Sequence, residues 1–182
     1  HHPAGQFRLL GQQLQDGARQ HGLAAAGFAD NAERPAGADG EIDIRVAHSS
    51  VNFKDALAGT GKGKILRRFP LVGGIDVAGH VVASRDPAFK EGDAVLVTGS
   101  GLSETSDGGY GQYARIESQW AIPLPHGLTL RESMILGTAG FTAALALLRM
   151  QENRQTPELG PLAVTGATGG VGSLAVDIFS AA

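Results

Sequence analysis

The sequence of 182 residues contains no cysteine, and only 5% of its residues are aromatic. Without cysteine the chain cannot form disulfides, use a thiolate nucleophile or build a cysteine-based zinc site. Apart from the two at the N-terminus, its histidines do not fall in closely spaced pairs, so no metal site is predicted. The absence of cysteine is also compatible with a cytoplasmic location.

Long apolar runs and concentrated positive charge are missing as well. No uninterrupted apolar run reaches about 18 residues, so we predict no membrane-spanning segment and no membrane partner. Lysine and arginine are scattered, and the formal net charge is -3. Without a basic stripe, a nucleic-acid partner is not expected.

Glycine is abundant, with 27 residues, and short apolar segments alternate with turn residues over much of the chain. Ile42, Ile44 and Val46 alternate with Asp43 and Arg45, a pattern typical of a half-buried strand over residues 41–49. A short helix is predicted within residues 50–57. Further strands are predicted at 7–13, 18–26, 75–84, 94–98, 113–116 and 120–123. Many short strands separated by turns indicate a β-barrel or sandwich.

The pattern changes from strands to helices near residue 129. Residues 130–150 are rich in alanine and leucine and favour a helix. Thr129 and Glu132 have the spacing of a capping box at its start. Gly137 and Gly140 predict either a kink or two separate helices.

A linker at 152–160 precedes a predicted short buried strand at 161–165 and an apolar helix from 173 onward. We therefore expect two domains. The first is a β-rich domain over residues 1–128, and the second is the N-terminal part of an α/β domain over residues 129–182.

The glycine-rich segment between the last predicted strand and helix is the sharpest motif. It reads Val-Thr-Gly-Ala-Thr-Gly-Gly-Val-Gly over residues 164–172. A pyrophosphate needs bare backbone N–H groups at a helix N-terminus, which glycine leaves accessible. Gly169 and Gly172 occupy the second and third glycine positions of a dinucleotide-binding fingerprint. Ala167 departs from the usual first glycine, and a plain glycine-rich turn is the alternative interpretation.

Several motifs in order resemble the medium-chain dehydrogenase/reductase family, in its zinc-free quinone oxidoreductase-like branch and especially its acrylyl-CoA reductase subgroup. The likeness extends from about residue 42 to 182, so a C-terminally truncated member is expected. The matching segments are Val51–Leu57, Thr60–Lys64, Phe69–Gly79, Gly108–Arg115, Gly137–Ala143 and the glycine loop.

The resemblance implies a fold class, a cofactor and a reaction. The fold is a β-rich GroES-like barrel followed by the start of an α/β Rossmann domain, which is incomplete. The expected activity is NADPH-dependent reduction of an activated alkene, an enoyl-CoA such as acryloyl-CoA, without zinc. The full-length protein is expected to be a homodimer.

Individual residues carry over from the family motifs. The pyrophosphate loop of the family is matched by Thr168, Gly169, Gly170 and Val171. Phe53 matches a tyrosine that lies against the cofactor, and Thr138 matches a threonine expected near the nicotinamide amide. Gly73 stands where the family usually has proline. Ser106 and Asp107 replace a bulkier pair in a loop expected to border the substrate, which leaves the acyl specificity open.

Other polar residues have two interpretations each. Asn52, our candidate catalytic residue, could donate a hydrogen bond to substrate or cofactor, or its amide could hold the strand-to-helix turn. Lys54 and Asp55 could bind polar groups, although a local solvated pair is favoured. Asp76 lies between apolar residues and is interpreted as structural. One basic cluster could attract CoA phosphates or be a plain solvated loop. It comprises Lys62, Lys64, Arg67 and Arg68.

Three alternatives to an acrylyl-CoA reductase stay open. The protein could be a quinone reductase of the same fold, or a non-catalytic binding or structural protein, because fold alone does not establish activity. The chain by itself could also be inactive, and we expect it to bind NADPH weakly or not at all. The residue that would select NADPH over NADH is expected about 20 residues beyond the glycine loop, past residue 182.

Overall fold

The computed structural model describes residues 40–182, and the predicted strands at 7–13 and 18–26 lie outside the described residues. Within the described part, residues 40–138 belong to one compact unit and residues 139–182 to a second. The division therefore falls at Thr138, later in the chain than the predicted domain boundary after Leu128. Each unit is described by itself below.

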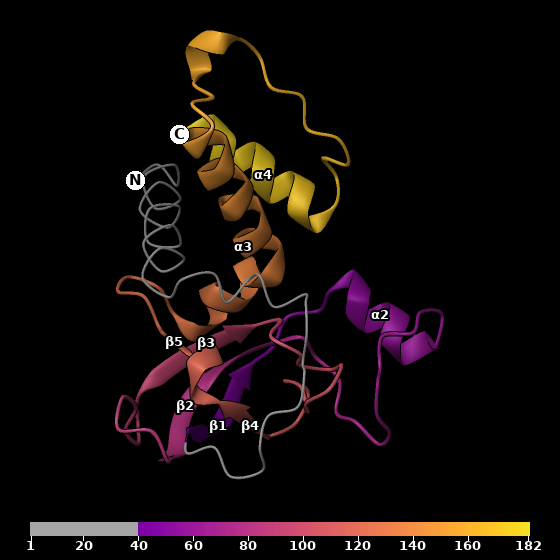
Figure 1. Cartoon of the computed structure of the whole chain (residues 1–182), viewed down its shortest axis with the longest axis vertical. Helices are drawn as coiled ribbons and strands as arrows, with labels where there is room; N and C mark the ends of the chain where they lie inside the picture. The colour runs from indigo at the N-terminus through magenta and orange to yellow at the C-terminus, as the bar shows by residue number, and fades with distance from the viewer. Residues whose placement is uncertain (1–39) are drawn as a thin grey trace. The chain divides into compact units, whose positions relative to one another are not determined.

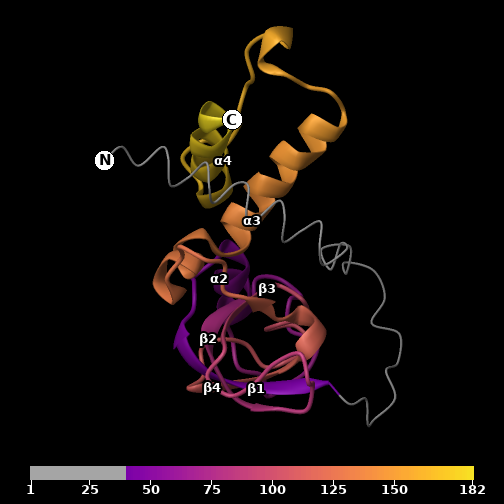
Figure 2. The same ribbon diagram turned by 90° about the vertical axis from the view of Figure 1, so that its left-hand side faces the viewer.

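The unit of residues 40–138 is built on one antiparallel sheet of five strands in the order β4-β1-β2-β3-β5. In the two views the strands curve around a common interior (Figures 1 and 2). The predicted strands in this part of the chain are confirmed, with small shifts at their ends. The strands are β1 (Glu41–His48), β2 (Asp76–Ser84), β3 (Ala94–Thr98), β4 (Tyr113–Glu117) and β5 (Ile122–Pro123).

The predicted alternation in β1 decides which side chains enter the interior. Ile42 and Ile44 are buried and Val46 packs against the same core, whereas Arg45 is exposed. Asp43 also points outward. Its carboxylate accepts hydrogen bonds from the guanidinium of Arg115 on β4 at 2.7 and 3.0 Å. Burial of the apolar side of each strand is the main force that stabilises this unit. The core comprises Ile42, Ile44, Val77, Val81, Val95, Val97, Leu102, Ala114, Ile116 and Ala121.

The helix α2 (Phe53–Thr60) follows β1 and stands outside the curved sheet (Figure 1). It confirms the short helix predicted in this region, although it begins and ends three residues later. Gly61 ends it in the left-handed conformation with φ of 67°, and its N–H donates to the carbonyl oxygen of Ala58 at 3.2 Å. Glycine is well suited to this terminating position because it has no side chain to clash.

The helix α3 (Leu130–Glu152) begins with the predicted capping box. The backbone N–H of Glu132 donates to Oγ1 of Thr129 at 3.2 Å, and the Glu132 carboxylate accepts from the N–H of Thr129 at 2.9 Å. The predicted kink is also confirmed, because Gly137 has non-helical angles of φ 48° and ψ -154°. The chain thus forms two helical stretches on either side of Gly137.

By length and composition alone, α3 is the one helix among the described residues that could cross a membrane. Its apolar side chains instead line two protein cores. Met134 packs with Ala78 and Leu96, and Ala143 and Leu147 pack in the second unit. This packing is typical of a core helix in a globular protein.

The unit of residues 139–182 holds the second stretch of α3 and the helix α4 (Gly170–Ala181). Its small core joins Ala143 and Leu147 of α3 to Ala175 and Ile178 of α4. The predicted buried strand at 161–165 is wrong for this structure, because no strand forms there and most of the segment is exposed. A strand needs a neighbouring strand to bond its backbone, and the described residues of this unit contain no other.

Candidate functional site

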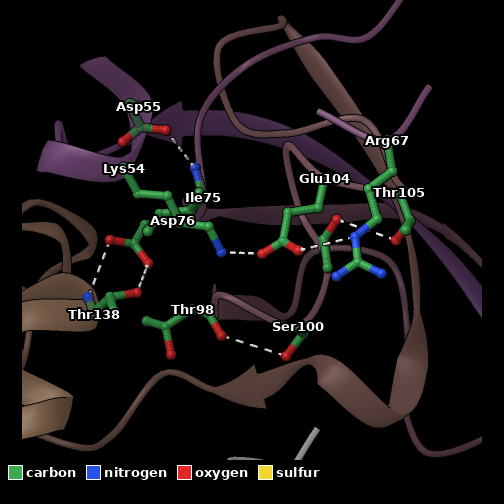
Figure 3. Close-up of polar contacts among 11 residues, drawn as sticks. Lys54, Asp55, Arg67, Ile75, Asp76, Thr98, Ser100, Glu104, Thr105 and Thr138 are labelled. Carbon is green, nitrogen blue, oxygen red and sulfur yellow. Dashed lines mark hydrogen bonds and ion pairs between the residues drawn. The ribbon is translucent and has the colours of Figure 1, made fainter. Parts of the chain in front are cut away.

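Asp76, the first residue of β2, is fully buried and organises the polar residues around it. Its Oδ2 accepts hydrogen bonds from Nδ2 of Asn52 at 2.9 Å, from the backbone N–H of Thr138 at 3.0 Å and from the hydroxyl of Ser50. Its Oδ1 accepts from the hydroxyl of Thr138 at 2.5 Å (Figure 3). Hydrogen bonds of this kind compensate a buried carboxylate for its lost hydration. The structure agrees with the structural interpretation of Asp76.

The kink at Gly137 allows this arrangement. A Cβ atom at residue 137 would lie 2.7 Å from Oδ2 of Asp76 and 2.9 Å from Oγ of Ser50. Any larger residue would therefore displace the carboxylate, and the positive φ independently favours glycine. The predicted break in α3 thus brings the N–H of Thr138, at the start of the second helical stretch, against Asp76.

Asn52 precedes α2 and has the extended backbone of a helix N-cap. Its side-chain nitrogen donates to Oγ of Ser50 at 3.1 Å as well as to Asp76. Its backbone N–H donates to Oδ2 of Asp55 at 2.8 Å. The geometry favours the second interpretation of Asn52, an amide that holds the strand-to-helix turn. A catalytic role for Asn52 stays a prediction.

The interpretation of Lys54 and Asp55 as a solvated pair is wrong. Asp55 is buried, and its Oδ1 accepts the N–H of Ile75 at 3.1 Å. Lys54 forms an ion pair with Glu104, which also lies 3.9 Å from Arg67 (Figure 3). Burial lowers the pKa of the Lys54 ammonium, while the charge of Asp55 opposes this shift. The sequence could not show the pairing because Glu104 is 50 residues from Lys54.

Phe53 lies at the first position of α2, and its side chain is 80% exposed. Val51, two residues earlier, is as exposed, so Asn52 is flanked by two apolar side chains that the unit itself does not bury. An exposed phenylalanine is available to a ligand. Its contact with a cofactor stays a prediction. Thr138, the other expected contact in this unit, instead directs its hydroxyl and its N–H to Asp76.

The basic cluster divides into two parts. Arg68 bonds the loop that contains Glu104, through its Nε to the carbonyl oxygen of Thr105 at 2.8 Å and through an ion pair with Asp107 at 3.1 Å. Arg67 faces Glu104, as described above. Lys62 and Lys64 are exposed. The acidic side chains of this loop thus offset the arginine charge, and the role of the two lysines as a phosphate-attracting patch stays untested.

The glycine loop leads into the N-terminus of α4, the local context predicted for a pyrophosphate site. Gly166 has φ of 63°, so it makes the tight turn that Ala167 does not. A Cβ at Gly172 would lie 2.1 Å from the carbonyl oxygen of Gly166, so the loop packs directly on the first helical turn. Thr168, Gly169, Gly170 and Val171 are all exposed. The first N–H groups of a helix lack acceptors within it and are free to bind an anion.

Tyr110 was not singled out from the sequence. Its hydroxyl donates to the carbonyl oxygen of Ser50 at 3.2 Å, which brings the ring beside the segment that carries Asn52 and Phe53. Burial, and then the nearby carboxylate of Asp55, raise the pKa of Tyr110 to about 12. Tyr110 lies within the family-matching segment Gly108–Arg115, and the glycines before it are the local signal for a close backbone approach.

No group of three or more His, Cys, Asp or Glu side chains within residues 40–182 could hold a metal ion. The polar cluster around Asp76 is built from hydroxyl and amide donors rather than from metal ligands. It can therefore fix the positions of Asn52 and Thr138, and the exposed aromatic groups nearby can contact a ligand.

Comparison with known proteins relates this geometry to a family. Residues 38–126 match the model of the alcohol dehydrogenase GroES-like domain. The chain is 46% identical over 141 residues to the acrylyl-CoA reductase AcuI of Ruegeria pomeroyi. The aligned region covers 78% of this chain and 43% of that protein. It is 51% identical over 137 residues to the "Putative quinone oxidoreductase YhfP" of Bacillus subtilis, covering 75% and 42%.

Solved structures of relatives agree with the fold. The yhdH oxidoreductase of Salmonella enterica in complex with NADP matches with a TM-score of 0.74 and 49% identity, over 81% of this chain and 45% of that one. The Bacillus subtilis yhfP structure with NAD bound gives a TM-score of 0.71 at 49% identity, over 81% and 44%. The chain spans less than half the length of these relatives. Through its GroES-like domain and the motifs that follow, the chain belongs to the medium-chain dehydrogenase/reductase family, in the branch that includes acrylyl-CoA reductases and quinone oxidoreductases.

Proposed function

We propose that the protein reduces the activated alkene of an enoyl-CoA, such as acryloyl-CoA, with NADPH as the hydride donor. The carrying observation is the exposed glycine loop at the N-terminus of α4, in a chain 46% identical to an acrylyl-CoA reductase. A relative that shares the fold has a structure in complex with NADP, which supports this choice of cofactor.

The residues of the loop fit a pyrophosphate group. Residues 168–171 form the exposed edge of the loop. A side chain at Gly172 would push the loop away from the helix. The N-terminal dipole of α4 adds a favourable field for negative charge. We therefore propose that Thr168, Gly169, Gly170 and Val171 hold the cofactor phosphates.

When bound, the nicotinamide would supply the hydride for the β-carbon of the alkene, and a proton added at the α-carbon completes the reduction. Phe53 offers an apolar wall on the surface of residues 40–138 and requires no rearrangement to do so. Asp76 fixes Asn52 and Thr138, so both are held in place before any ligand arrives. Such preorganisation is how a site positions polar groups without a reorganisation cost at the moment of reaction.

The quinone reductase reading is the second candidate, and a specific observation favours it. The protein YhfP, named for that activity, is 51% identical to the chain over the region they share. The structure of the same protein has NAD bound, which also keeps NADH in consideration. A homodimer in the cytoplasm is our proposal for the complete protein in either case.

The test is a steady-state assay of the full product of the gene that encodes this chain. We expect acryloyl-CoA with NADPH to give a kcat/KM at least about tenfold above that of a benzoquinone, and above that of NADH with the same acyl-CoA. The Ruegeria pomeroyi reductase serves as the positive control for the assay. Reduction of quinone but not of acryloyl-CoA would replace the first candidate with the second.

Calorimetry on the 182-residue chain tests the separate expectation that this chain alone binds NADPH weakly or not at all. A dissociation constant in the micromolar range would contradict it. The two measurements are independent, because the assay tests the substrate and the calorimetry tests how much of the protein the cofactor needs.

A further inference from the structure

The backbone of Tyr110 is fixed by a close crossing of two glycine-rich segments. The N–H groups of Gly108, Gly109 and Tyr110 donate to carbonyl oxygens of residues 72–74 at 2.9, 2.9 and 3.0 Å. A Cβ at Gly108 would lie 2.1 Å from the carbonyl oxygen of Gly74, so the two segments could not approach this closely with larger residues. Tyr110 therefore leaves a backbone that has little freedom to shift.

The ring of Tyr110 rests on two of these glycines. A Cβ at Gly74 would lie 2.8 Å from Cδ1 of the ring, and one at Gly73 would lie 3.1 Å from Cδ2. The absence of side chains at these two positions lets the ring pack directly against the backbone. Because backbone lies directly beneath it, the ring cannot tilt downward to make room for a ligand.

The far end of the ring is held as well. The phenol donates to the carbonyl oxygen of Ser50 at 3.2 Å. A side chain fixed at both ends behaves as a rigid surface, whereas a free one would move aside at low cost. Yet Tyr110 is 48% exposed, so one side of this fixed ring faces outward.

The ring stands beside the segment that carries the candidate site. Ser50, to which the phenol is bonded, precedes Val51, Asn52 and Phe53 in the chain, and Val51 and Phe53 are strongly exposed apolar residues. Val72, whose carbonyl oxygen accepts from Gly108, is exposed as well. Exposed apolar side chains of this kind are available to contact a ligand.

We infer that Tyr110 is a specificity-determining residue, whose fixed ring limits the length of the acyl group that can lie against Asn52 and Phe53. This inference rests on the proposed function, because it takes the substrate to be an enoyl thioester. A small side chain at residue 110 would leave the space above Gly73 and Gly74 unfilled. Longer acyl chains would then enter space that the ring occupies.

The test compares kcat/KM for acryloyl-CoA and trans-2-octenoyl-CoA, with saturating NADPH and the full gene product. We expect Tyr110→Ala to raise the ratio of octenoyl-CoA to acryloyl-CoA by about tenfold or more, since several methylene groups gain room. Tyr110→Phe keeps the ring and should change the ratio less than about threefold. Gly73→Ala, which disturbs the ring through a contact with Cδ2, should shift the ratio in the same direction by a smaller factor.

Tyr113→Ala is the matched control, because Tyr113 is an exposed tyrosine on β4 that takes no part in the candidate site. An unchanged ratio in a folded Tyr110→Ala enzyme overturns the inference, and so does an equal loss on both substrates. If Tyr110→Ala fails to fold, Tyr110→Leu and Gly73→Ala decide the question by the same ratio. If the wild-type protein reduces no acyl-CoA, the proposed function itself is wrong. This result is obtained before any variant is made, so it is distinct from a failure of the inference about Tyr110.

Discussion

The two units of the chain position their functional residues in different ways. In residues 40–138, a closed core and a buried carboxylate hold Asn52 and Thr138, and the contacts join residues far apart in sequence. In residues 139–182, the glycine loop takes its shape from local backbone geometry, and the supporting core is small. Long-range packing thus positions the candidate residues of the first unit, and local stereochemistry shapes the glycine loop of the second.

The described part of the second unit also has several large apolar side chains outside its small core. Leu159, Leu162, Val171 and Val176 are all exposed large side chains. We therefore expect the two units to differ in stability as well as in construction. Truncating a buried side chain should lower the free energy of unfolding more in the first unit than in the second, because water can reach and fill the space left in the second.

The largest expected effect compares truncations in the two cores. Ile44→Ala, at a fully buried residue, should lower the free energy of unfolding of residues 40–138 by about 3 kcal/mol. Leu147→Ala, at the 9% exposed edge of the second core, should cost its unit only about 1–2 kcal/mol. Urea denaturation followed by fluorescence of the sole tryptophan, Trp120, reports the first unit, since this residue packs on its core.

Hydrogen exchange of the amides of α4 reports the second unit. If Leu147→Ala shifts the Trp120 transition as much as Ile44→Ala does, the two cores unfold together and the expected difference in stability between the units is wrong. If only the α4 amides lose protection from exchange in Leu147→Ala, the second unit unfolds separately from the first.

Next in size is the loss of the buried carboxylate. Asp76→Asn should lower the free energy of unfolding of the first unit by about 2–3 kcal/mol, because an amide NH₂ group would face the donors of Ser50, Asn52 or Thr138. The same Trp120 transition measures it. Asp107→Asn is the control, since Asp107 accepts the N–H of Val72 at a half-exposed position where water can substitute. Equal costs for both variants would show that burial of Asp76 is unimportant.

A third prediction tests the local stereochemistry of the second unit. Gly172→Ala should destabilise α4 by about 2 kcal/mol, because the added Cβ overlaps the carbonyl oxygen of Gly166. Gly170→Ala should instead stabilise the helix by about 0.5–1 kcal/mol, since its Cβ would make only an ordinary contact with Ala139. Far-UV circular dichroism and α4 exchange rates measure both. Similar effects of the two variants would contradict the assignment of Gly172 as the packing glycine.

Local patterns were sufficient to predict much of the fold. The alternation around Ile44 gave β1, the spacing of Thr129 and Glu132 gave the start of α3, and Gly137 gave its kink. The loop ending at Gly172 was also predicted, in position and in its approach to a helix N-terminus. Each of these features depends on residues a few positions apart, which a single sequence displays directly.

The features that escaped prediction depend on distant residues. The ion pair of Lys54 with Glu104 and the contact of Tyr110 with Ser50 span 50 and 60 positions. The predicted strand at 161–165 failed for a related reason, because apolar residues form a strand only where another strand can bond to them. The buried position of Asp55 likewise depends on a distant residue, because its carboxylate accepts the N–H of Ile75 on a different segment.

The smallest expected effect is the alkaline titration of Tyr110. Its pKa of about 12 lies above that of an unfolded tyrosine, near 10, because burial and the Asp55 carboxylate disfavour the phenolate. The folded state therefore holds this proton more tightly. The contribution to stability is fully present below about pH 10 and is lost as the pH rises through about 12. Half-exposure of the ring reduces its size, since solvent screens the carboxylate.

The chain has two tyrosines, so Tyr113→Phe leaves Tyr110 as the only phenol to titrate. The absorbance of its phenolate should then rise with a midpoint near 12 in the folded protein, and near 10 in concentrated urea. Circular dichroism at each pH verifies that the sheet is intact through the folded titration. A folded-state midpoint near 10 would mean that the phenol faces solvent and is not tethered to Ser50. That result would remove one of the two contacts that fix the ring and leave only its packing against Gly73 and Gly74.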